Sequence, residues 1–425
     1  MTLLLFLAVL FGALALGMPI AFALILGGAA LMLQLEVFDA QLVAQNLIAG
    51  VDSYPLMAVP FFILAGELMN AGGLSRRIVA LAIAGVGHVR GGLGYVVIAT
   101  AMLLASLSGS AIADTAALTT LLLPMMRAHG YPLAGSAGLI AAGGIIAPII
   151  PPSLPFILYG VSTSTSISSL FLAGIVPGLL MGVVLVLVWR RRLAGFGCIP
   201  QPPAPARERR RALLEAGWAL LLPVLILGGL RGGWFTPTEA AVVAAVYALV
   251  AGCVLYRELD RGALYSAFVR SARTTGVVMF LCAAATVSSY MITLAELPGQ
   301  LAGPLAPLLA HPRLLMAVIV GLLLLVGMVM DLTPSILILA PVLLPLARSA
   351  GIDPVYFGVM FVLVGSIGLI TPPVGTVLNV VGGVGGVPML QTVRGVLPYV
   401  GAYCALLGLF VLFPGLITAP LQWLR

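Results

Sequence analysis

Long apolar runs separated by short polar interruptions extend over almost the whole chain. Residues 3–33 and 213–230 are long enough to cross about 30 Å of hydrocarbon as helices. The runs are continuous, whereas the strands of a membrane β-barrel would alternate at every second position. The pattern therefore predicts an all-α polytopic membrane protein.

The interruptions themselves repeat. Residues 144–153 read Gly-Ile-Ile-Ala-Pro-Ile-Ile-Pro-Pro-Ser, and residues 365–374, which lie 221 positions later, read Gly-Ser-Ile-Gly-Leu-Ile-Thr-Pro-Pro-Val. The register holds without gaps, so that Pro124 matches Pro345 and Pro177 matches Pro398. Paired Gly/Pro breaks in matching apolar segments are typical of secondary transporters, whose sites lie where the helices break.

Composition supports a membrane as the solvent. Apolar residues make up 62% of the chain, charged residues 8%, and the mean hydropathy is +1.20, whereas a soluble domain has about 25% charged residues. The net charge of +7 comes from arginine alone, and we interpret it as topogenic charge, not as a nucleic-acid surface. The four cysteines are scattered and favour neither a disulfide framework nor a metal centre.

The strongest orientation signal is a pair of arginine clusters, at residues 190–192 and 207–211, with four prolines between them. Positive charge places this segment in the cytoplasm. It predicts a flexible basic linker over residues 190–212, which separates a first repeat at 1–189 from a second half at 213–425. Most arginines then face the cytoplasm, and the exceptions are Arg231, Arg313, Arg348 and Arg425.

Each half is expected to contain a re-entrant hairpin and a broken transmembrane helix. Residues 92–127 begin and end near arginines with a Ser/Gly cluster in the middle, so the segment turns back instead of crossing. Residues 314–348 match this hairpin. The broken helices are expected at 133–160 and 355–381.

The remaining expected elements complete two repeats of opposite orientation. An extra span over residues 213–230 lets the second repeat insert upside down. This places the N-terminus in the cytoplasm and the C-terminus in the periplasm. The other expected helices are repeat starts at 3–33 and 240–256, surface arms at 39–52 and 258–272, and spans at 55–70, 276–296, 170–189 and 396–413.

The hairpin turns carry the informative polar side chains. The first reads Ser-Leu-Ser-Gly-Ser over residues 106–110 and is followed by Asp114, and the second begins at Asp331. An ionisable residue at membrane depth is costly, so both carboxylates are functional candidates. The structural alternative is a carboxylate that caps a half-helix.

Oxygen is the only abundant ligand type at these turns and breaks, which suits a hard cation. Carbonyl groups near Pro148, Pro152, Pro372 and Val374 lack helical partners and can face an ion. Sodium is favoured over protons because the turns and breaks contain two carboxylates and no histidine.

A polar stretch, residues 162–169, follows the first break. It lines the outer route of a polar solute, or it is a solvated loop. The sequence leaves both readings open.

Four motifs resemble the large membrane subunit (M subunit, DctM type) of tripartite ATP-independent periplasmic (TRAP) transporters, and the resemblance spans essentially the whole chain. They are Ser-Gly-Ser-Ala-Ile-Ala-Asp at 108–114, Ile-Pro-Pro-Ser at 150–153, Pro-Leu-Met-Ala-Val-Pro-Phe-Phe at 55–62 and Gly-Leu-Ile-Thr-Pro-Pro-Val-Gly at 368–375.

The resemblance implies partners and a mechanism. Such subunits pair with a small four-helix membrane subunit (Q type) in the bacterial inner membrane. They take a small carboxylate from a periplasmic binding protein (P type). Two sodium ions drive uptake, with no organic cofactor, and an elevator-like domain moves against a scaffold.

Carried onto this sequence, the resemblance implies two sodium sites. The first uses Ser108, Ser110 and the carbonyl groups of Ala147 and Pro152. The second uses Asp331, Thr333 and the carbonyl groups of Gly368 and Val374. Substrate contacts are expected at Ser110, Asp114, Ser153, Ser335 and Thr376.

Alternatives remain at this level. A stand-alone two-hairpin anion symporter or exporter, coupled to protons, would need no periplasmic partner. An enzyme is disfavoured because no buried Ser/His, metal-ligand or paired-carboxylate set is visible, and a channel would need no alternating hairpins. Sialic acid, C4-dicarboxylates and keto acids all remain as solutes, and helix N-termini and hydroxyl groups are the expected partners of the solute carboxylate.

Overall fold

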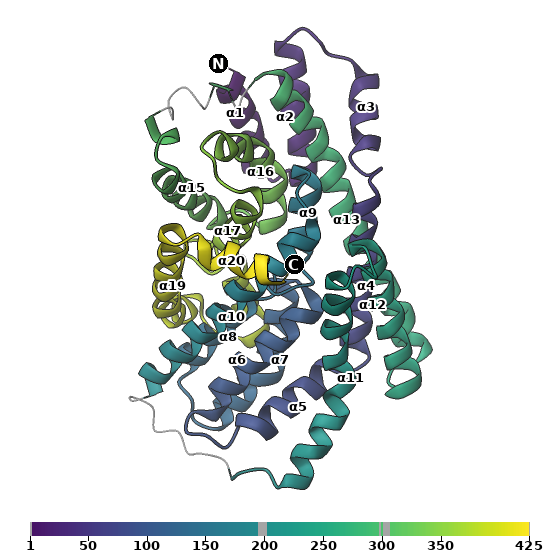
Figure 1. The fold of residues 1–425 in the computed structure, drawn as a ribbon, viewed down its shortest axis with the longest axis vertical. Helices are drawn as coiled ribbons and strands as arrows, with labels where there is room; N and C mark the ends of the chain where they lie inside the picture. Colours follow the sequence, from purple (N-terminus) through teal and green to yellow (C-terminus); the bar gives the residue numbers. More distant parts are fainter. Residues whose placement is uncertain (1, 194–201, 297–298, 301–306, 425) are drawn as a thin grey trace.

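The computed structural model describes residues 2–193, 202–296, 299–300 and 307–424. This part of the chain is helical and contains no strand (Figure 1). Seven of its helices are long and apolar enough to cross a membrane, and several others of 10–17 residues are apolar. The prediction of an all-α polytopic membrane protein is confirmed.

Two series of helices follow one another along the chain. The first series comprises α1 (Thr2–Ala15), α2 (Ile20–Gln34), α3 (Ala40–Ala49), η1 (Tyr54–Met57), α4 (Ala58–Ala71), α5 (Leu74–Val86), α6 (Gly92–Ser108), α7 (Ala111–Ala128), α8 (Leu133–Gly144), α9 (Leu154–Thr163) and α10 (Ile167–Arg192). The second comprises α11 (Ala206–Arg231), α12 (Pro237–Val250), η3 (Ala251–Leu255), α13 (Arg261–Leu294), α15 (Pro312–Gly327), α16 (Leu332–Ser349), α17 (Pro354–Gly368), α18 (Thr376–Gly385), α19 (Met389–Leu412) and α20 (Gly415–Leu424).

The repeat seen in the sequence is a structural repeat. Helices α6 and α7 form the first expected hairpin, and α15 and α16 form its counterpart. Helices α8 and α9 are the two halves of the first broken helix, and α17 and α18 are those of the second. The 221-residue offset that matches the Gly/Pro breaks also matches both ends of α7 with both ends of α16. The repeat in the sequence and the repeat in the structure therefore have the same offset.

The N-terminal segment departs from the prediction. The single helix expected over residues 3–33 is wrong, because α1 and α2 are separate helices that pack against each other. Gly17 adopts φ +81°, in the left-handed region, and Pro19 ends the turn as the residue before α2. Gly and Pro end one helix and begin another here, although no charged residue interrupts the apolar run.

The two surface arms differ from each other. The first arm, α3, is a separate helix, whereas the arm expected at 258–272 and the span expected at 276–296 form one continuous helix, α13. Pro55 follows the first arm, and Gly276 occupies the matching position in α13. A proline there cannot continue a helix, and a glycine can.

The basic linker is shorter than predicted. Arg190, Arg191 and Arg192 form the last turn of α10. Helix α11 begins at Ala206, directly after Pro205, and contains the second arginine cluster. Residues 194–201 lie outside the described part of the chain.

Two short helices, α5 and α20, were not expected from the sequence. Helix α5 connects α4 to the first hairpin, and α20 follows Pro414 at the end of α19. They have 13 and 10 residues, respectively. A transmembrane helix needs about 20 apolar residues, so neither segment has the length that predicts a span.

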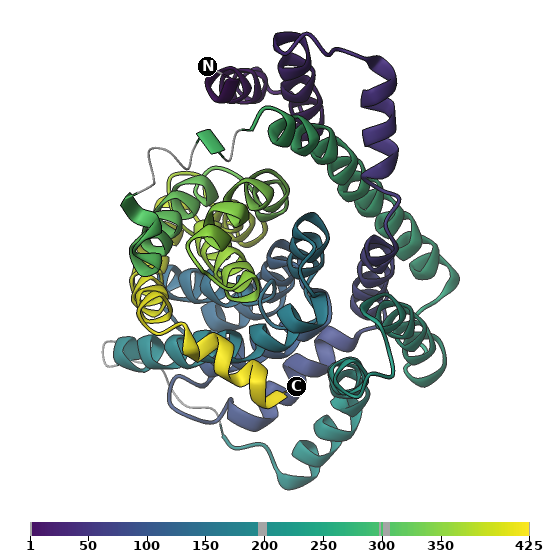
Figure 2. The same ribbon diagram turned by 45° about the horizontal axis from the view of Figure 1, so that its top comes forward.

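The helices form an outer layer and an inner cluster. In Figure 2, α1 to α4 and α11 to α13 curve around one side of the cluster that contains the hairpins and broken helices. Aromatic side chains pack where the two repeats meet inside the cluster. The ring of Tyr159 on α9 lies 6.4 Å from Phe357 and 6.2 Å from Phe361 on α17, and its hydroxyl group donates to the Pro354 carbonyl at 3.1 Å.

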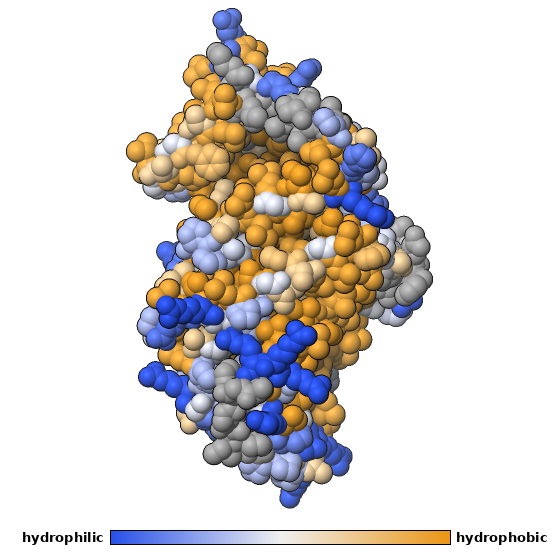
Figure 3. Space-filling model, turned by 90° about the vertical axis from the view of Figure 1, so that its left-hand side faces the viewer, coloured by the Kyte–Doolittle hydropathy of each residue, from blue (hydrophilic) through white to orange (hydrophobic). Residues whose placement is uncertain are grey.

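The outer surface suits a bilayer. Figure 3 shows a broad hydrophobic region across the middle of one face, with hydrophilic side chains gathered toward its lower end. Exposed apolar side chains occur on many of the outer helices, for example Phe22 on α2 and Val277 on α13. Hydrocarbon, not water, is the solvent that stabilises such a surface.

Candidate cation and solute site at the hairpin tips

The tip of the first hairpin lies directly on the first helix break. Helix α6 ends at Ser108, Gly109 adopts φ +62°, and Ser110 caps α7 by accepting from the Ala113 amide at 3.4 Å. A Cβ atom at position 109 would lie 2.9 Å from the Pro152 carbonyl oxygen. Glycine is therefore required here for two reasons, its φ and the close approach of the break.

Asp114 is buried behind this tip, one turn into α7. Its side chain is 4% exposed, and the Ser108 hydroxyl group donates to Oδ1. Its Oδ2 has no hydrogen-bond partner in the described part of the chain, and neither does the neighbouring Thr115 hydroxyl group. An unpartnered buried carboxylate oxygen is costly unless something else binds it.

The first break is held open by Ser153. Its hydroxyl group donates to the Pro148 carbonyl and accepts from the Phe156 amide at 3.4 Å, so Ser153 caps α9. The first bond lies inside the break, and the second connects the break to the first turn of α9. The carbonyl groups of Ala147 and Pro152 accept no hydrogen bond from the described residues, and both residues are buried.

At the second tip the carboxylate and the serine exchange positions, because Asp331 matches Ser110 and Ser335 matches Asp114 at the 221-residue offset. Asp331 precedes α16, and its side chain makes no capping hydrogen bond to the helix. Ser335 donates its hydroxyl group to the Asp331 backbone carbonyl at 2.8 Å. The Asp331 side chain is thus half-buried beside the N-terminus of α16.

The second break is more open than the first. The Gly368 carbonyl accepts from the Thr371 amide at 2.9 Å, and the Val374 carbonyl accepts from the Asn379 side chain at 3.4 Å. Thr376, at the start of α18, has a buried hydroxyl group without a partner among the described residues. A carbonyl oxygen has two lone pairs, so each of these carbonyls can still bind a cation.

The two tips meet at one small cavity of about 70 Å³. Ser110 from the first tip lines it together with Asp331 and Thr333 from the second, and Pro148 comes from the first break. The other lining residues are Gly109, Ala111, Ile112, Leu154, Pro155, Leu332 and Leu369. A cavity of about 10–15 Å³ already holds one water molecule, so this cavity has room for an ion and a water molecule.

The structure therefore groups the expected site residues differently from the sequence. Ser110 shares a cavity with Asp331 and Thr333, although the resemblance assigned them to separate sodium sites. Ser108 is bonded to Asp114 behind the first tip. The division into two sodium sites, and the substrate contacts, stay predictions.

Sequence reasoning missed several residues of this region. Asn379 is one polar side chain that contacts the second break, and its amide inside an apolar helix was an available signal. The apolar lining residues Ile112, Leu154 and Leu369 carried no signal, because they resemble every other apolar position of a spanning helix.

Two repeated hairpins and broken helices, with a small cavity lined by both hairpin tips, define the architecture of a secondary membrane transporter. The chain belongs to the tripartite ATP-independent periplasmic (TRAP) transporter DctM component family, whose model matches residues 7–416. Members are permease subunits, not enzymes, and the family works with a periplasmic binding protein and a small membrane subunit.

Similar proteins agree with this assignment. The 2,3-diketo-L-gulonate TRAP transporter large permease protein YiaN of Escherichia coli is 56% identical over 425 residues, covering 100% of both chains. The isethionate TRAP transporter permease protein DctMQ of Oleidesulfovibrio alaskensis is 41% identical over 94% of this chain and 64% of its own length. The crystal structure of the Alcanivorax borkumensis YdaH transporter matches with a TM-score of 0.66 at 18% identity, over 90% of this chain and 91% of that one, which shows the shared fold.

Proposed function

We propose that this permease imports a small carboxylate into the bacterial cytoplasm and that an inward sodium gradient drives the import. The observation that carries the proposal is the cavity between the two hairpin tips. Its polar lining consists of hydroxyl groups and one carboxylate, which are ligands that hard cations prefer.

Sodium fits this cavity better than a proton relay does. A relay needs a chain of titratable side chains through the membrane. In the tip cavity Asp331 is the single titratable side chain among the lining residues, and hydroxyl oxygens surround it. We propose that Asp114, with its unpartnered oxygen, together with Ser108 and the carbonyl groups of Ala147 and Pro152, forms a second cation-binding region behind the first tip.

The solute is proposed to be a sugar-derived carboxylate. Support comes from the full-length relative at 56% identity, which is named for 2,3-diketo-L-gulonate, a six-carbon keto acid. A more distant relative is named for isethionate, a sulfonate. Sulfonates are therefore the rival solute class.

The proposed partners are a periplasmic binding protein and a small membrane subunit. The relative from Oleidesulfovibrio alaskensis, of which this chain covers 64%, is named DctMQ, and this supports the second partner. We propose that the inner cluster moves against the outer layer, as in an elevator, and that the cluster carries the tip cavity across the inner membrane.

The orientation follows the arginines, with one revision. The last turn of α10 and the start of α11 carry the arginine clusters, and we propose that both are cytoplasmic. The C-terminal α20 is then periplasmic, as expected from the sequence. Because α1 and α2 return on each other, we propose a periplasmic N-terminus in place of the cytoplasmic one expected from a single helix.

Transport by the reconstituted complex tests this function. Permease, small subunit and binding protein are assembled in liposomes, and uptake of labelled sugar acids, C4-dicarboxylates and isethionate is measured with and without a sodium gradient. We expect uptake of a sugar acid that collapses without the gradient. Uptake of isethionate alone, or uptake driven equally well by a proton gradient, would reject the carboxylate or the sodium assignment, respectively.

A further inference from the structure

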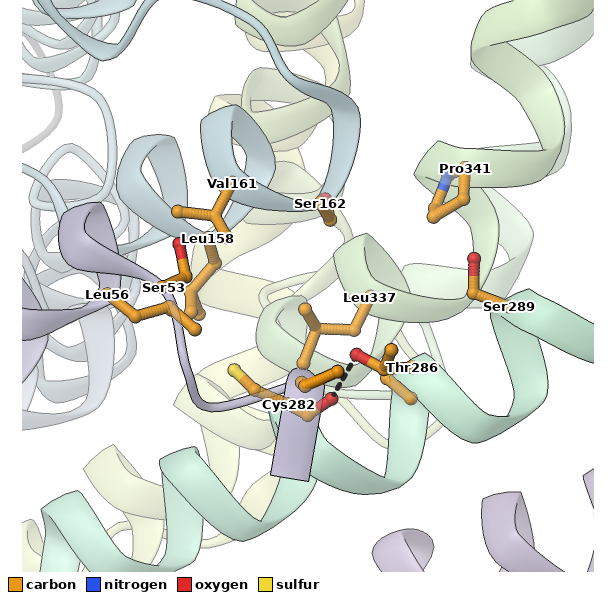
Figure 4. Close-up of a pocket in the computed structure, with 13 residues that line it drawn as sticks. Ser53, Leu56, Leu158, Val161, Ser162, Cys282, Thr286, Ser289, Leu337 and Pro341 are labelled. Atoms are coloured by element: carbon orange, nitrogen blue, oxygen red, sulfur yellow. Dashed lines mark hydrogen bonds between the residues drawn. The ribbon is translucent and has the colours of Figure 1, made fainter. Parts of the chain in front are cut away.

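A second polar region lies between the inner cluster and the outer layer, away from the hairpin tips. It consists of two adjoining cavities of about 290 and 640 Å³, which share Ser53 and Val161. We call these two cavities together the hydroxyl groove. Figure 4 shows the smaller one, between α9 and α16 of the cluster and α13 of the outer layer.

Hydroxyl groups dominate the polar lining of this groove. No charged side chain lines either cavity in the described part of the chain. In the smaller cavity the hydroxyl groups come from both sides: Ser162 lies on α9, and Thr286 and Ser289 lie on α13. Residues 282, 285, 286 and 289 share one face of α13 by their spacing.

Two of the lining hydroxyl groups already donate their hydrogen atoms to the protein. Thr286 donates to the Cys282 carbonyl at 3.0 Å, and Ser162 donates to the Tyr159 carbonyl at 3.1 Å (Figure 4 shows the first bond). What each of these groups offers to the groove is therefore its oxygen lone pairs. Lone pairs accept hydrogen bonds from the hydroxyl groups of a ligand, but they repel a carboxylate, which is only an acceptor.

The groove also has a defined side. The larger cavity is lined by residues 164–168 between α9 and α10, by Tyr54 in η1 and by Thr236 and Thr238 at the start of α12. Residues 164–168 lie at the start of α10 and Thr236 follows the end of α11, in both cases at the helix end opposite to the arginine cluster. Tyr54 lies beside them, because its carbonyl accepts from the Thr238 hydroxyl group at 3.3 Å. The groove thus opens toward the side on which a binding protein delivers its solute.

We infer that the hydroxyl groove is the entry site of the permease for a polyhydroxylated solute, and that it recognises the hydroxyl-bearing carbon chain and not the carboxylate. This inference rests on the proposed function for the solute class. Its volume suits the task, because the smaller cavity alone is about four times the size of the cavity at the tips. Residues 162–169, for which the sequence allowed either a solute route or a solvated loop, then line the outer route of the solute.

Cysteine protection tests the inference without relying on transport. Ser289→Cys is introduced after replacement of the four natural cysteines by alanine, and right-side-out vesicles with permease and small subunit are treated with an impermeant maleimide. A six-carbon sugar acid and a neutral six-carbon polyol, each at saturating concentration, should slow labelling several-fold. Hexanoate, which lacks hydroxyl groups, should leave the rate unchanged. Thr293→Cys, on the same helix but outside the groove, should be protected by none of them.

Substitutions give a second readout. Thr286→Val and Ser289→Ala each remove one hydroxyl group from the lining, so the apparent KM for sugar-acid uptake should rise roughly fivefold in each variant. Thr293→Val is the matched control, because Thr293 makes the same hydrogen bond to the carbonyl four residues before it. Its KM should not change.

The outcomes separate the two proposals. Normal sodium-driven uptake with unchanged KM in both variants, and no protection by the polyol, would overturn the groove while the proposed function stands. Protection by the polyol with no sodium-dependent uptake in the wild type would support the groove and reject the proposed coupling. Equal protection by hexanoate would overturn the assignment to the hydroxyl-bearing chain.

Discussion

At the scale of single residues, two positions connect backbone geometry to the chemistry of the tips. Gly109 lets the first tip lie on the first break, and Asp331 supplies the carboxylate of the tip cavity. One acts through the absence of a side chain and the other through charge. Their substitutions should therefore fail in different ways.

Gly109→Ala should impair transport more than it impairs folding. The new methyl group would approach the Pro152 carbonyl oxygen at 2.9 Å and push the tip away from the break. Gly130→Ala is the matched control, because Gly130 has φ +73° but nothing within 4 Å of its Cβ position. Both variants should lose about 1–2 kcal/mol of stability from the left-handed backbone. Only Gly109→Ala should also reduce uptake, by tenfold or more; equal uptake in the two variants would contradict the contact.

Asp331→Asn should raise the sodium concentration required for half-maximal uptake by roughly tenfold or more, because the negative charge of the tip cavity is lost in a setting of low dielectric constant. Asp39→Asn is the control: Asp39 accepts from the Gln41 amide at 2.7 Å as the cap of α3, and asparagine caps equally well. Sodium activation curves of the two variants give the comparison. An unshifted curve for Asp331→Asn would remove this carboxylate from the cation site.

At the scale of elements, the sequence predicted the hairpins and broken helices, whose boundaries carry repeated Ser, Gly and Pro residues. It did not predict boundaries that lack such a repeated signal. The hairpins and both breaks were predictable because Ser, Gly and Pro interrupt apolar runs twice at the same offset. The division of residues 3–33 into α1 and α2 was missed because Gly17 and Pro19 interrupt the run without adding a charged residue to it. The sequence also could not predict that Ser110 and Asp331 line the same cavity. That contact depends on the packing of two tips that are more than 200 residues apart in the chain.

One contact between elements has a testable pH dependence. Glu258, between η3 and α13, pairs with Arg76 and Arg77 of α5, at 2.8 Å for Arg77, whose guanidinium lies 3.8 Å from the centre of the Tyr256 ring. Partial burial raises the pKa of Glu258, but the Arg77 hydrogen bond and the two positive charges outweigh it and hold the pKa below its usual value.

Glu258→Gln should destabilise the purified permease by about 1 kcal/mol at neutral pH, as expected for a partly exposed pair. A lowered pKa stabilises the fold above the unfolded-state value of about 4.3 and loses that effect as the pH falls through the folded value. The difference in Tm between wild type and variant should therefore be full above about pH 5 and shrink below it. Glu36→Gln, at an exposed position, should show no difference; a Glu258 effect that persists at low pH would rule out the ion pair as its cause.

At the scale of the whole molecule, the proposed transport requires an inverted repeat and a cluster that moves with the tip cavity. The orientation has its own test in the cysteine-free permease. Thr2→Cys and Leu416→Cys should be labelled from the periplasm only, and Arg207→Cys from the cytoplasm only. Labelling of Thr2→Cys from the cytoplasm would restore the single N-terminal crossing, and labelling of Leu416→Cys and Arg207→Cys from one side would reject the inverted arrangement.

The central claim is that one tip from each repeat meets the other at a cavity that binds the coupling cation. The most direct measurement is inhibition of uptake by Cd²⁺ in the cysteine-free permease that carries Ser110→Cys and Thr333→Cys together, because two thiolates that line one cavity chelate this soft ion. The double variant should be inhibited at concentrations at least tenfold lower than either single variant, and sodium should slow the inhibition. Equal sensitivity of the double and single variants, or inhibition that sodium does not affect, would contradict the account.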